Sequence, residues 1–310
     1  MRFTSRPATL LRVVLMGAAL FSFDAFAQPP KVLDHAAHGL FTGEEWRFRR
    51  DNLVGGLFAR IAADLVSIPS GAPWWSGGDW AFFGTTVGST IALSVGRPSL
   101  DVRFQDFVQN EVLGGPGHFT IWNRTGDLII WPGTGLAVLT FLIVGLITGD
   151  AFSIETALLM GEAFAVAQLY HNMIKLLAGR AGPGQPELGG EYFGPARGYK
   201  LWPAGTPSGH MASMYALLSV LMYSVDEPAL YVGLNLFALA FGAALVGDNY
   251  HWLSDVTLGA AIGFCVGRWV VQHRSTHYVY GKDAPPVINV SVMPLILPGS
   301  GAGFGVVGAF

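Results

Sequence analysis

The chain has 310 residues, of which 51% are hydrophobic and only 13% are charged, and its formal net charge is -3 at pH 7. Soluble domains carry about 25% charged residues, so this composition excludes an ordinary water-facing surface and favours a protein embedded in a lipid bilayer. The small negative charge and the lack of a basic run in the sequence give no support for nucleic-acid binding. A single cysteine, Cys265, excludes an intrachain disulfide and a cysteine-based metal cluster.

Residues 1–27 have the pattern of a signal peptide. Three arginines precede an apolar run from Val13 to Phe23, and Ala25-Phe26-Ala27 matches a small-x-small cleavage site. Retention of the segment as an N-terminal anchor is the alternative. Cleavage would start the mature chain at Gln28 and indicates an exported protein of a bacterium.

The stretch 28–78 is predicted to be a polar N-terminal arm that leads into an amphipathic helix. Residues 53–69 carry apolar side chains at helical spacing, interrupted by Arg60 and Asp64. This pattern favours a helix on the membrane surface or against a helical bundle rather than a membrane span. The Pro-Trp-Trp run at 73–75 fits an interfacial position.

Residues 79–274 are predicted to form one all-α domain, a transmembrane bundle of five to six spans. A helix needs about 20 apolar residues to cross a bilayer, and such segments recur through this region. The expected spans are 128–147, 152–174, 209–224, 229–247 and 252–271, with the Gly- and Thr-rich 79–96 as the weakest candidate. A short amphipathic helix is expected at 101–113, and the Gly- and Pro-rich stretch 176–207 is expected to be a loop.

The segment 275–310 is predicted to be a C-terminal tail that forms a β-hairpin. Residues 287–295 and 303–310 favour strands, and a Gly-rich turn joins them. One hairpin cannot form a membrane barrel, so we expect this tail to pack onto the rest of the protein.

The run Thr206-Pro207-Ser208-Gly209-His210 precedes one of the apolar segments. We expect Thr206 to cap the helix there and Pro207 to occupy its first turn. The first four amides of a helix have no partner within the helix, so such a helix start binds anions, including phosphate. Ser208 adds a hydroxyl, Gly209 permits close approach, and His210 is placed to protonate a leaving oxygen.

A second pair of residues, His251 and Asp255, lies four positions apart, so on a helix both would share one face. The carboxylate can then hold one ring nitrogen and leave the other as a nucleophile or base. Lys175 and Arg180 end an earlier apolar segment and supply two cations, as a phosphoryl transition state requires. Together these residues predict a site that handles a phosphate.

Neither a metal nor a cofactor is predicted. His210, His251 and Asp255 could contact a metal, but the sequence offers no well-placed fourth ligand. His171 lies in an apolar stretch and is interpreted as a core histidine.

These motifs resemble the type-2 phosphatidic acid phosphatase and vanadium haloperoxidase superfamily. Its signature has three blocks, Lys-x6-Arg-Pro, Pro-Ser-Gly-His and Ser-Arg-x5-His-x3-Asp. The second block is complete at 207–210, and the third keeps His251 and Asp255. The resemblance covers roughly 150–272. It implies an all-α bundle, a phosphohistidine intermediate on His251, Asp255 as the orienting carboxylate and His210 as the acid.

The sequence departs from the signature at both of its arginines. Gly182 stands where the first block has arginine, although Pro183 is in place and Arg180 lies two residues earlier. Ala244 and Leu245 occupy the Ser-Arg positions of the third block. Either other cations of the chain supply the positive charge of the two missing arginines, or the site binds phosphate weakly.

The predicted phosphate ligands are therefore Lys175, Arg180, Ser208 and Gly209. Arg197 and Lys200, in the 176–207 loop, are the other cations that could contribute, although they are interpreted chiefly as solvated loop charges. Lipid phosphotransferases that share the histidine/histidine/aspartate core also lack the arginines, so their loss does not by itself imply inactivity.

The leading functional hypothesis is a membrane-bound hydrolase that removes phosphate from a lipid phosphate or polyprenyl pyrophosphate, with the bilayer and that lipid as its partners. The alternatives are a lipid phosphotransferase with the same core, a vanadate-dependent halide oxidase, which the missing arginines disfavour, and a degenerate non-catalytic membrane protein. The expected location is the bacterial inner membrane. We favour an active site that faces the periplasm, which requires 53–69 to span or 79–96 not to span.

Overall fold

The computed structural model describes residues 53–96, 98–112, 120–184, 205–225, 227–275, 289–297 and 301–309. The predicted signal peptide and polar arm lie outside the described residues, and so do Arg197 and Lys200 of the long loop.

The described chain from residue 53 to residue 275 is helical, which confirms the predicted all-α class. In chain order the helices are α2 (Leu53–Ser70), η3 (Ala72–Trp74), α3 (Gly77–Ser94), α4 (Leu100–Phe107), η4 (Val108–Val112), α5 (Thr120–Thr148), α6 (Ala151–Ala178), α7 (Gly209–Val225), α8 (Pro228–Gly247) and α9 (Leu253–Arg274). The segments that the sequence predicts to be helical between 53 and 271 fall on these helices, and the predicted helix 101–113 is divided between α4 and η4, with residue 113 outside the described residues.

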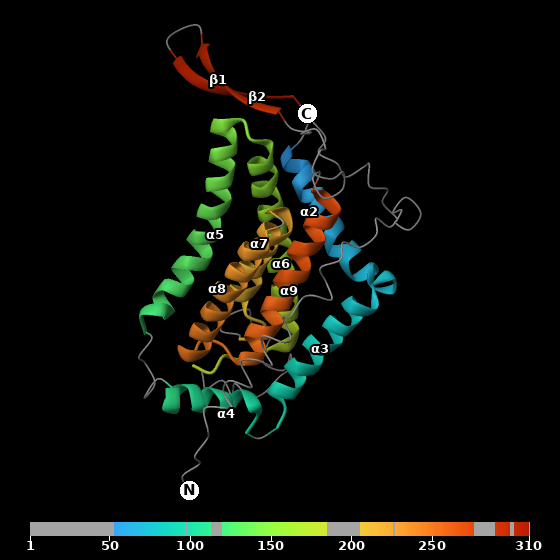
Figure 1. Ribbon diagram of the computed structural model, residues 1–310, viewed down its shortest axis with the longest axis vertical. Coiled ribbons are helices and arrows are strands. Elements are labelled where there is room, and N and C mark those ends of the chain that lie inside the picture. The colour runs from blue at the N-terminus through green and yellow to red at the C-terminus, as the bar shows by residue number, and fades with distance from the viewer. Residues whose placement is uncertain are drawn as a thin grey trace.

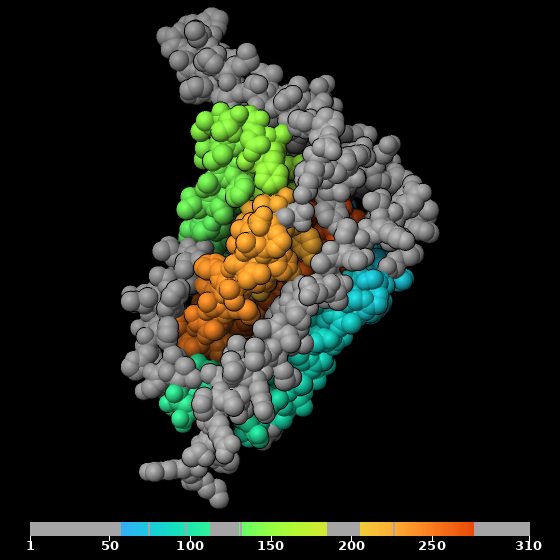
Figure 2. All heavy atoms as spheres, in the orientation of Figure 1, coloured from blue at the N-terminus to red at the C-terminus, as the bar shows by residue number. Residues whose placement is uncertain are grey.

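Three helices form the centre of the molecule. Helices α6, α7 and α9 pack on one another, with α5 and α8 on one side and α2 and α3 on the other (Figure 1). In the space-filling view, α5 and α3 flank the central helices from opposite sides (Figure 2). Helix α4 lies across the lower end of the bundle, next to the starts of α7 and α9 (Figure 1).

Three of the described helices, α6, α8 and α9, are long and apolar enough to cross a membrane, and shorter apolar helices cover Pro132–Thr148 and Gly209–Val225. The outer faces of α5 and α8 are also apolar. Their exposed side chains include Leu136, Leu139, Ile143, Ile147, Val232, Leu236 and Phe237. Large exposed apolar faces of this kind are typical of helices in contact with lipid chains, and together with the long apolar helices they indicate a membrane protein.

A stripe of glycines on α9 lets this helix pack closely against α7. Gly259, Gly263 and Gly267 are each four residues apart and lie on one helix face. A Cβ atom on Gly267 would lie 2.6 Å from the Ala216 carbonyl oxygen, and Cβ atoms on Gly259 and Gly263 would collide with the carbonyls of Ser208 and Ala212. Small residues permit this close approach between membrane helices. The contact begins at Ser208 and so fixes the start of α7 against α9.

A buried cluster of four charges connects α2 to the central helices. Arg60 Nε lies 2.7 Å from a carboxylate oxygen of Glu162, and Arg274 Nη2 lies 2.6 Å from Asp64 Oδ1. Arg274 Nε also approaches Glu162 at 3.5 Å. Two positive and two negative groups balance, as buried charges require. Arg60 and Asp64, which interrupt the apolar pattern of α2, therefore face the bundle. Of the two positions predicted for this helix, the one against the bundle is observed, not the one on the membrane surface.

Two strands follow the bundle near the C-terminus. Strands β1 (Asn289–Leu297) and β2 (Gly301–Ala309) pair antiparallel, from Asn289 opposite Ala309 to Leu297 opposite Gly301. The packing of this segment onto the bundle stays a prediction.

We predict that Gly263→Ala destabilises the protein by about 1–3 kcal/mol, the usual cost of overpacking a tight core. The new methyl would meet the Ala212 carbonyl, the Ala216 nitrogen at 2.8 Å and the Tyr215 Cβ at 2.9 Å. Equilibrium unfolding of the full chain in detergent micelles measures the loss.

The matched control is Gly233→Ala on α8, where a Cβ meets nothing within 4 Å. Because alanine favours a helix over glycine by about 1 kcal/mol, this variant is expected to be neutral or slightly more stable. Equal effects of the two substitutions would contradict the role given to the glycine stripe.

Candidate functional site

The candidate site lies at the lower end of the bundle, where α6 ends, α7 and α9 begin, and α4 crosses beneath them (Figure 1). Segments distant in sequence therefore meet at one place. The residues predicted for phosphate chemistry come from these three helix ends.

The end of α6 supplies the two predicted cations. Gly179 adopts a left-handed conformation with φ 58° and its N–H donates to the Lys175 carbonyl at 3.0 Å, which ends the helix. Lys175 is buried and interacts electrostatically with Asp255. Arg180 follows the cap and is fully buried.

The start of α7 differs from the prediction in its cap. The helix begins at Gly209, and Ser208 rather than Thr206 caps it, because the Met211 N–H lies 3.4 Å from Ser208 Oγ. Thr206 Oγ1 instead donates to the Asp255 carboxylate. The expectation that Thr206 is the cap is therefore wrong, and this hydroxyl joins the two motifs directly.

His251 does not lie on a helix with Asp255, as the spacing suggested, but in the turn before α9. Its Nδ1 lies 3.6 Å from Asp255 Oδ2, an ion-pair distance rather than a hydrogen bond. The same carboxylate oxygen accepts the Trp252 N–H at 3.0 Å. The Asp255 backbone carbonyl accepts the Ser208 N–H at 2.9 Å, a second link between the motifs.

The two motif histidines face each other. His210 Nδ1 and His251 Nε2 are 3.4 Å apart, although 41 positions separate them in sequence. Both rings are buried, and Tyr250 lies edge-on to each, with ring centroids 5.1 Å and 5.6 Å away. Hence one reacting atom can contact both rings, which is the arrangement expected of a nucleophile and its partner acid.

Asp255 belongs to a buried ionic network that the sequence did not reveal. Arg180 Nη1 lies 2.9 Å from Asp101 Oδ2 and 3.5 Å from Asp255 Oδ1. The Ser254 hydroxyl accepts from Arg180 at 2.8 Å and donates to Asp101 at 2.5 Å. Burial raises the pKa of the Asp101 carboxyl above its ordinary value, and the Arg180 guanidinium opposes that rise. Arg180 therefore contacts two carboxylates at the base of the site.

His171 is buried, as the interpretation as a core histidine expects, and its ring also lies against the start of α7. It is only 5% exposed, and a Cβ placed on Gly209 would lie 2.8–2.9 Å from atoms of its imidazole, so the ring covers the start of α7. Electrostatic interactions connect it to Lys175, His251 and His210. The ring also interacts with the Pro207 carbonyl, but neither ring nitrogen makes a hydrogen bond of normal geometry to a described residue.

The sequence did contain a signal for His171, because it lies one helical turn before Lys175. Gln168 extends the same face of α6, and its Nε2 donates to the Gly209 carbonyl at 3.2 Å and to Ser213 Oγ at 2.6 Å. This polar face of α6 is therefore directed at the start of α7.

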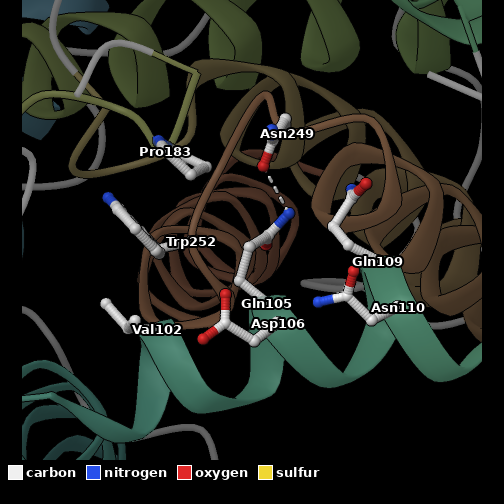
Figure 3. Close-up of a pocket in the computed structure, with 8 residues that line it drawn as sticks. All are labelled: Val102, Gln105, Asp106, Gln109, Asn110, Pro183, Asn249 and Trp252. Carbon is white, nitrogen blue, oxygen red and sulfur yellow. Dashed lines mark hydrogen bonds between the residues drawn. The ribbon is translucent and has the colours of Figure 1, made fainter. Parts of the chain in front are cut away.

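A pocket of about 290 Å³ includes Trp252, the neighbour of His251 in the chain, but neither motif histidine lines it. Figure 3 shows the residues that do. Helix α4, η4 and the two loops that precede α7 and α9 line it. The lining residues are Val102, Gln105, Asp106, Gln109, Asn110, Pro183, Asn249 and Trp252. Among the residues that the structure describes, no group of three or more His, Cys, Asp or Glu side chains could hold a metal ion.

Comparison with known families identifies the class of protein. Residues 156–278 match the model of the PAP2 superfamily, which agrees with the resemblance seen in the motifs. That superfamily comprises phosphatase-type hydrolases that act on phosphate esters. No curated protein and no solved structure matches the chain.

We predict that Asp101→Asn destabilises the protein by about 3 kcal/mol, because it removes one partner of a buried ion pair and leaves Arg180 undercompensated. Chemical unfolding of the full chain in micelles measures this loss. Asp106→Asn is the control, since Asp106 is exposed on the same helix. It should change stability by less than about 0.5 kcal/mol. Similar losses in both variants would show that Asp101 has no special role.

Proposed function

We propose that this protein is a membrane hydrolase that releases phosphate from a lipid phosphate or polyprenyl pyrophosphate through a phosphohistidine on His251. The observation that carries the proposal is the 3.4 Å approach of His210 Nδ1 to His251 Nε2 at one end of an apolar helical bundle. The anion-binding start of α7 lies at the same place.

The reaction follows from the positions of three side chains. His251 Nε2 attacks phosphorus, the bond to the leaving oxygen breaks, and His210 gives that oxygen a proton. Asp255 lies on the Nδ1 side of His251 and stabilises the charge that develops on the ring. Water then attacks the phosphohistidine and passes its proton to His210, the phosphorus–nitrogen bond breaks, and free phosphate leaves.

The proposed phosphate contacts are Lys175 and the amides at the start of α7, including that of Gly209 next to Ser208. We add His171, whose buried ring covers Gly209 and whose ring N–H can donate to a phosphate oxygen. Lys175 and His171 would then replace part of the charge and hydrogen bonding of the missing arginines.

Arg180 is assigned a positioning role rather than direct contact with phosphate. Its Nη1 lies between the carboxylates of Asp101 and Asp255. Through these two carboxylates Arg180 fixes the orientation of Asp255. Its effect on His251 is therefore indirect.

The apolar exterior supports a substrate that stays in the bilayer. We propose that α5 and α7 cross the membrane together with α6, α8 and α9, and that α4 lies at the interface beside the site. An acyl or prenyl chain could then remain among lipids while its head group reaches the start of α7. A site facing the periplasm of a bacterial inner membrane fits this arrangement.

The proposal is tested by phosphate release from phosphatidate, phosphatidylglycerol phosphate and a polyprenyl pyrophosphate. We expect the wild type to hydrolyse at least one of them. His251→Ala should lower kcat by about 10³-fold or more, and His210→Ala by about 10²-fold or more. His171→Ala should chiefly raise KM, by about tenfold, because a hydrogen bond to a charged group is lost.

His273→Ala is a matched control, because that ring stacks on Trp269 at the other end of α9; its kinetics should equal those of the wild type. No release from any of these lipids by the wild type would overturn the proposed function. Full activity of His251→Ala would overturn the mechanism alone.

A further inference from the structure

One face of α4 and η4 carries three buried polar residues. Asp101, Gln105 and Gln109 are spaced four positions apart, so they lie on about the same side of the helix. Their side chains are only 1%, 5% and 7% exposed. Figure 3 shows Gln105 extending from this helix toward Asn249, to which it is hydrogen-bonded. A helix that packs on a bundle usually buries apolar side chains, so this polar face needs partners inside the protein.

The two glutamines bond to the end of α8. Gln105 Nε2 donates to the Val246 carbonyl at 2.7 Å, and Gln109 Nε2 donates to the Gly247 carbonyl. The last four carbonyls of a helix have no partner within the helix, so these two side chains cap it. They hold two consecutive carbonyls at the point where α8 turns toward α9.

His251 is attached to the same helix end. Its backbone N–H donates to the Leu245 carbonyl at 3.2 Å, directly before the two carbonyls that the glutamines hold. Between them, Asn249 has a left-handed backbone conformation with φ 64°, which is uncommon for a residue other than glycine. Such a conformation persists only where its surroundings fix it, and Gln105 Nε2 donates to Asn249 Oδ1 at 2.7 Å. A shift of α4 would therefore change the path of the turn that carries His251.

Asp101 binds the other side of this turn. Its Oδ1 accepts the Ser254 N–H at 3.0 Å, and its Oδ2 accepts the Ser254 hydroxyl at 2.5 Å. Ser254 lies in the first turn of α9, where the amides have no partner within the helix. The same Oδ2 lies 2.9 Å from Arg180 Nη1. One face of α4 and η4 thus holds the end of α8 and the start of α9, on both sides of His251.

We propose that α4 and η4 form a clamp that positions His251, with Asp101, Gln105 and Gln109 as its positioning residues. The clamp acts through the turn between α8 and α9 and so sets the 3.4 Å separation of His251 Nε2 from His210 Nδ1. A displacement of about 1 Å in a reacting group can lower a rate by about 10²-fold. The three side chains therefore control the rate at which His251 reacts, and they leave the binding of phosphate to other residues.

This clamp precedes the segment that matches the PAP2 superfamily, which begins at residue 156. The family motifs therefore do not reveal it, although it holds the turn on which one of them lies. Its effect on the reaction rests on the proposed function, whereas its effect on the position of His251 does not.

The position of His251 is tested without turnover, by NMR of isotope-labelled histidine rings in the full chain in micelles. Gln105→Met and Gln109→Met remove the carboxamide donors at nearly constant side-chain length. We expect the ring signals of His251, assigned by their absence in His251→Ala, to shift in both variants, and those of His273 at the other end of α9 to stay unchanged. Asn110→Leu is the matched control, because it removes an exposed carboxamide from the same segment and should leave the His251 signals as in the wild type.

The effect on the reaction is tested by single-turnover labelling of His251 with a labelled lipid phosphate. We expect the rate constant of phosphorylation to fall about tenfold in each glutamine variant, with unchanged amplitude and unchanged KM, because the proposed phosphate contacts on α6 and α7 are intact. A purely structural role would instead lower the amplitude, since fewer molecules are folded, and leave the rate constant as in the wild type.

Three results would overturn the clamp: ring signals of His251 that shift in neither glutamine variant, an equal shift in Asn110→Leu, or a rate constant in both glutamine variants equal to that of the wild type. If the wild type forms no phosphohistidine on any of the lipid phosphates, the proposed function fails, and the ring signals alone then decide whether the clamp positions His251.

Discussion

Close packing of α9 on α7 is the constraint on which the candidate site depends. The glycines of α9 lie against backbone carbonyls of α7, and the first contact joins Gly259 to Ser208. This contact holds the start of α7 at the start of α9, where Thr206 and the Ser208 amide both bond to Asp255. A larger side chain in the stripe would separate the helices and with them His210 from His251. The packing of α9 on α7 inside the bundle therefore determines the distance between His210 and His251.

Charge balance is the second constraint. An apolar bundle cannot hold an isolated charge, so every buried ionic group needs a partner or a ligand. At one end of the molecule Arg60, Asp64, Glu162 and Arg274 balance one another. At the other end the carboxylates of Asp101 and Asp255 share Arg180, and Lys175 interacts electrostatically with Asp255. Two cations and two carboxylates therefore balance at this end as well.

Apolar periodicity was sufficient to predict the helices, because membrane helices need long apolar runs and polar breaks separate them. The motifs predicted that His210 and His251 act on the same phosphate, because the chemical role of each histidine follows from the residues next to it in the sequence. The sequence could not show that Asp101 is buried, since a carboxylate on a short amphipathic helix looks solvent-facing until α4 packs on the start of α9. The same holds for His171, whose apolar neighbours hide the polar face that it shares with Lys175.

The central claim is that His251 becomes phosphorylated during turnover. The most direct measurement is rapid mixing of the wild type with a labelled lipid phosphate substrate, followed by an alkaline quench, which preserves phosphohistidine, and peptide mapping. We expect the label on His251 within a single turnover and none in His251→Ala. Label on another residue, or rapid phosphate release with no labelled protein at any time, would contradict the mechanism.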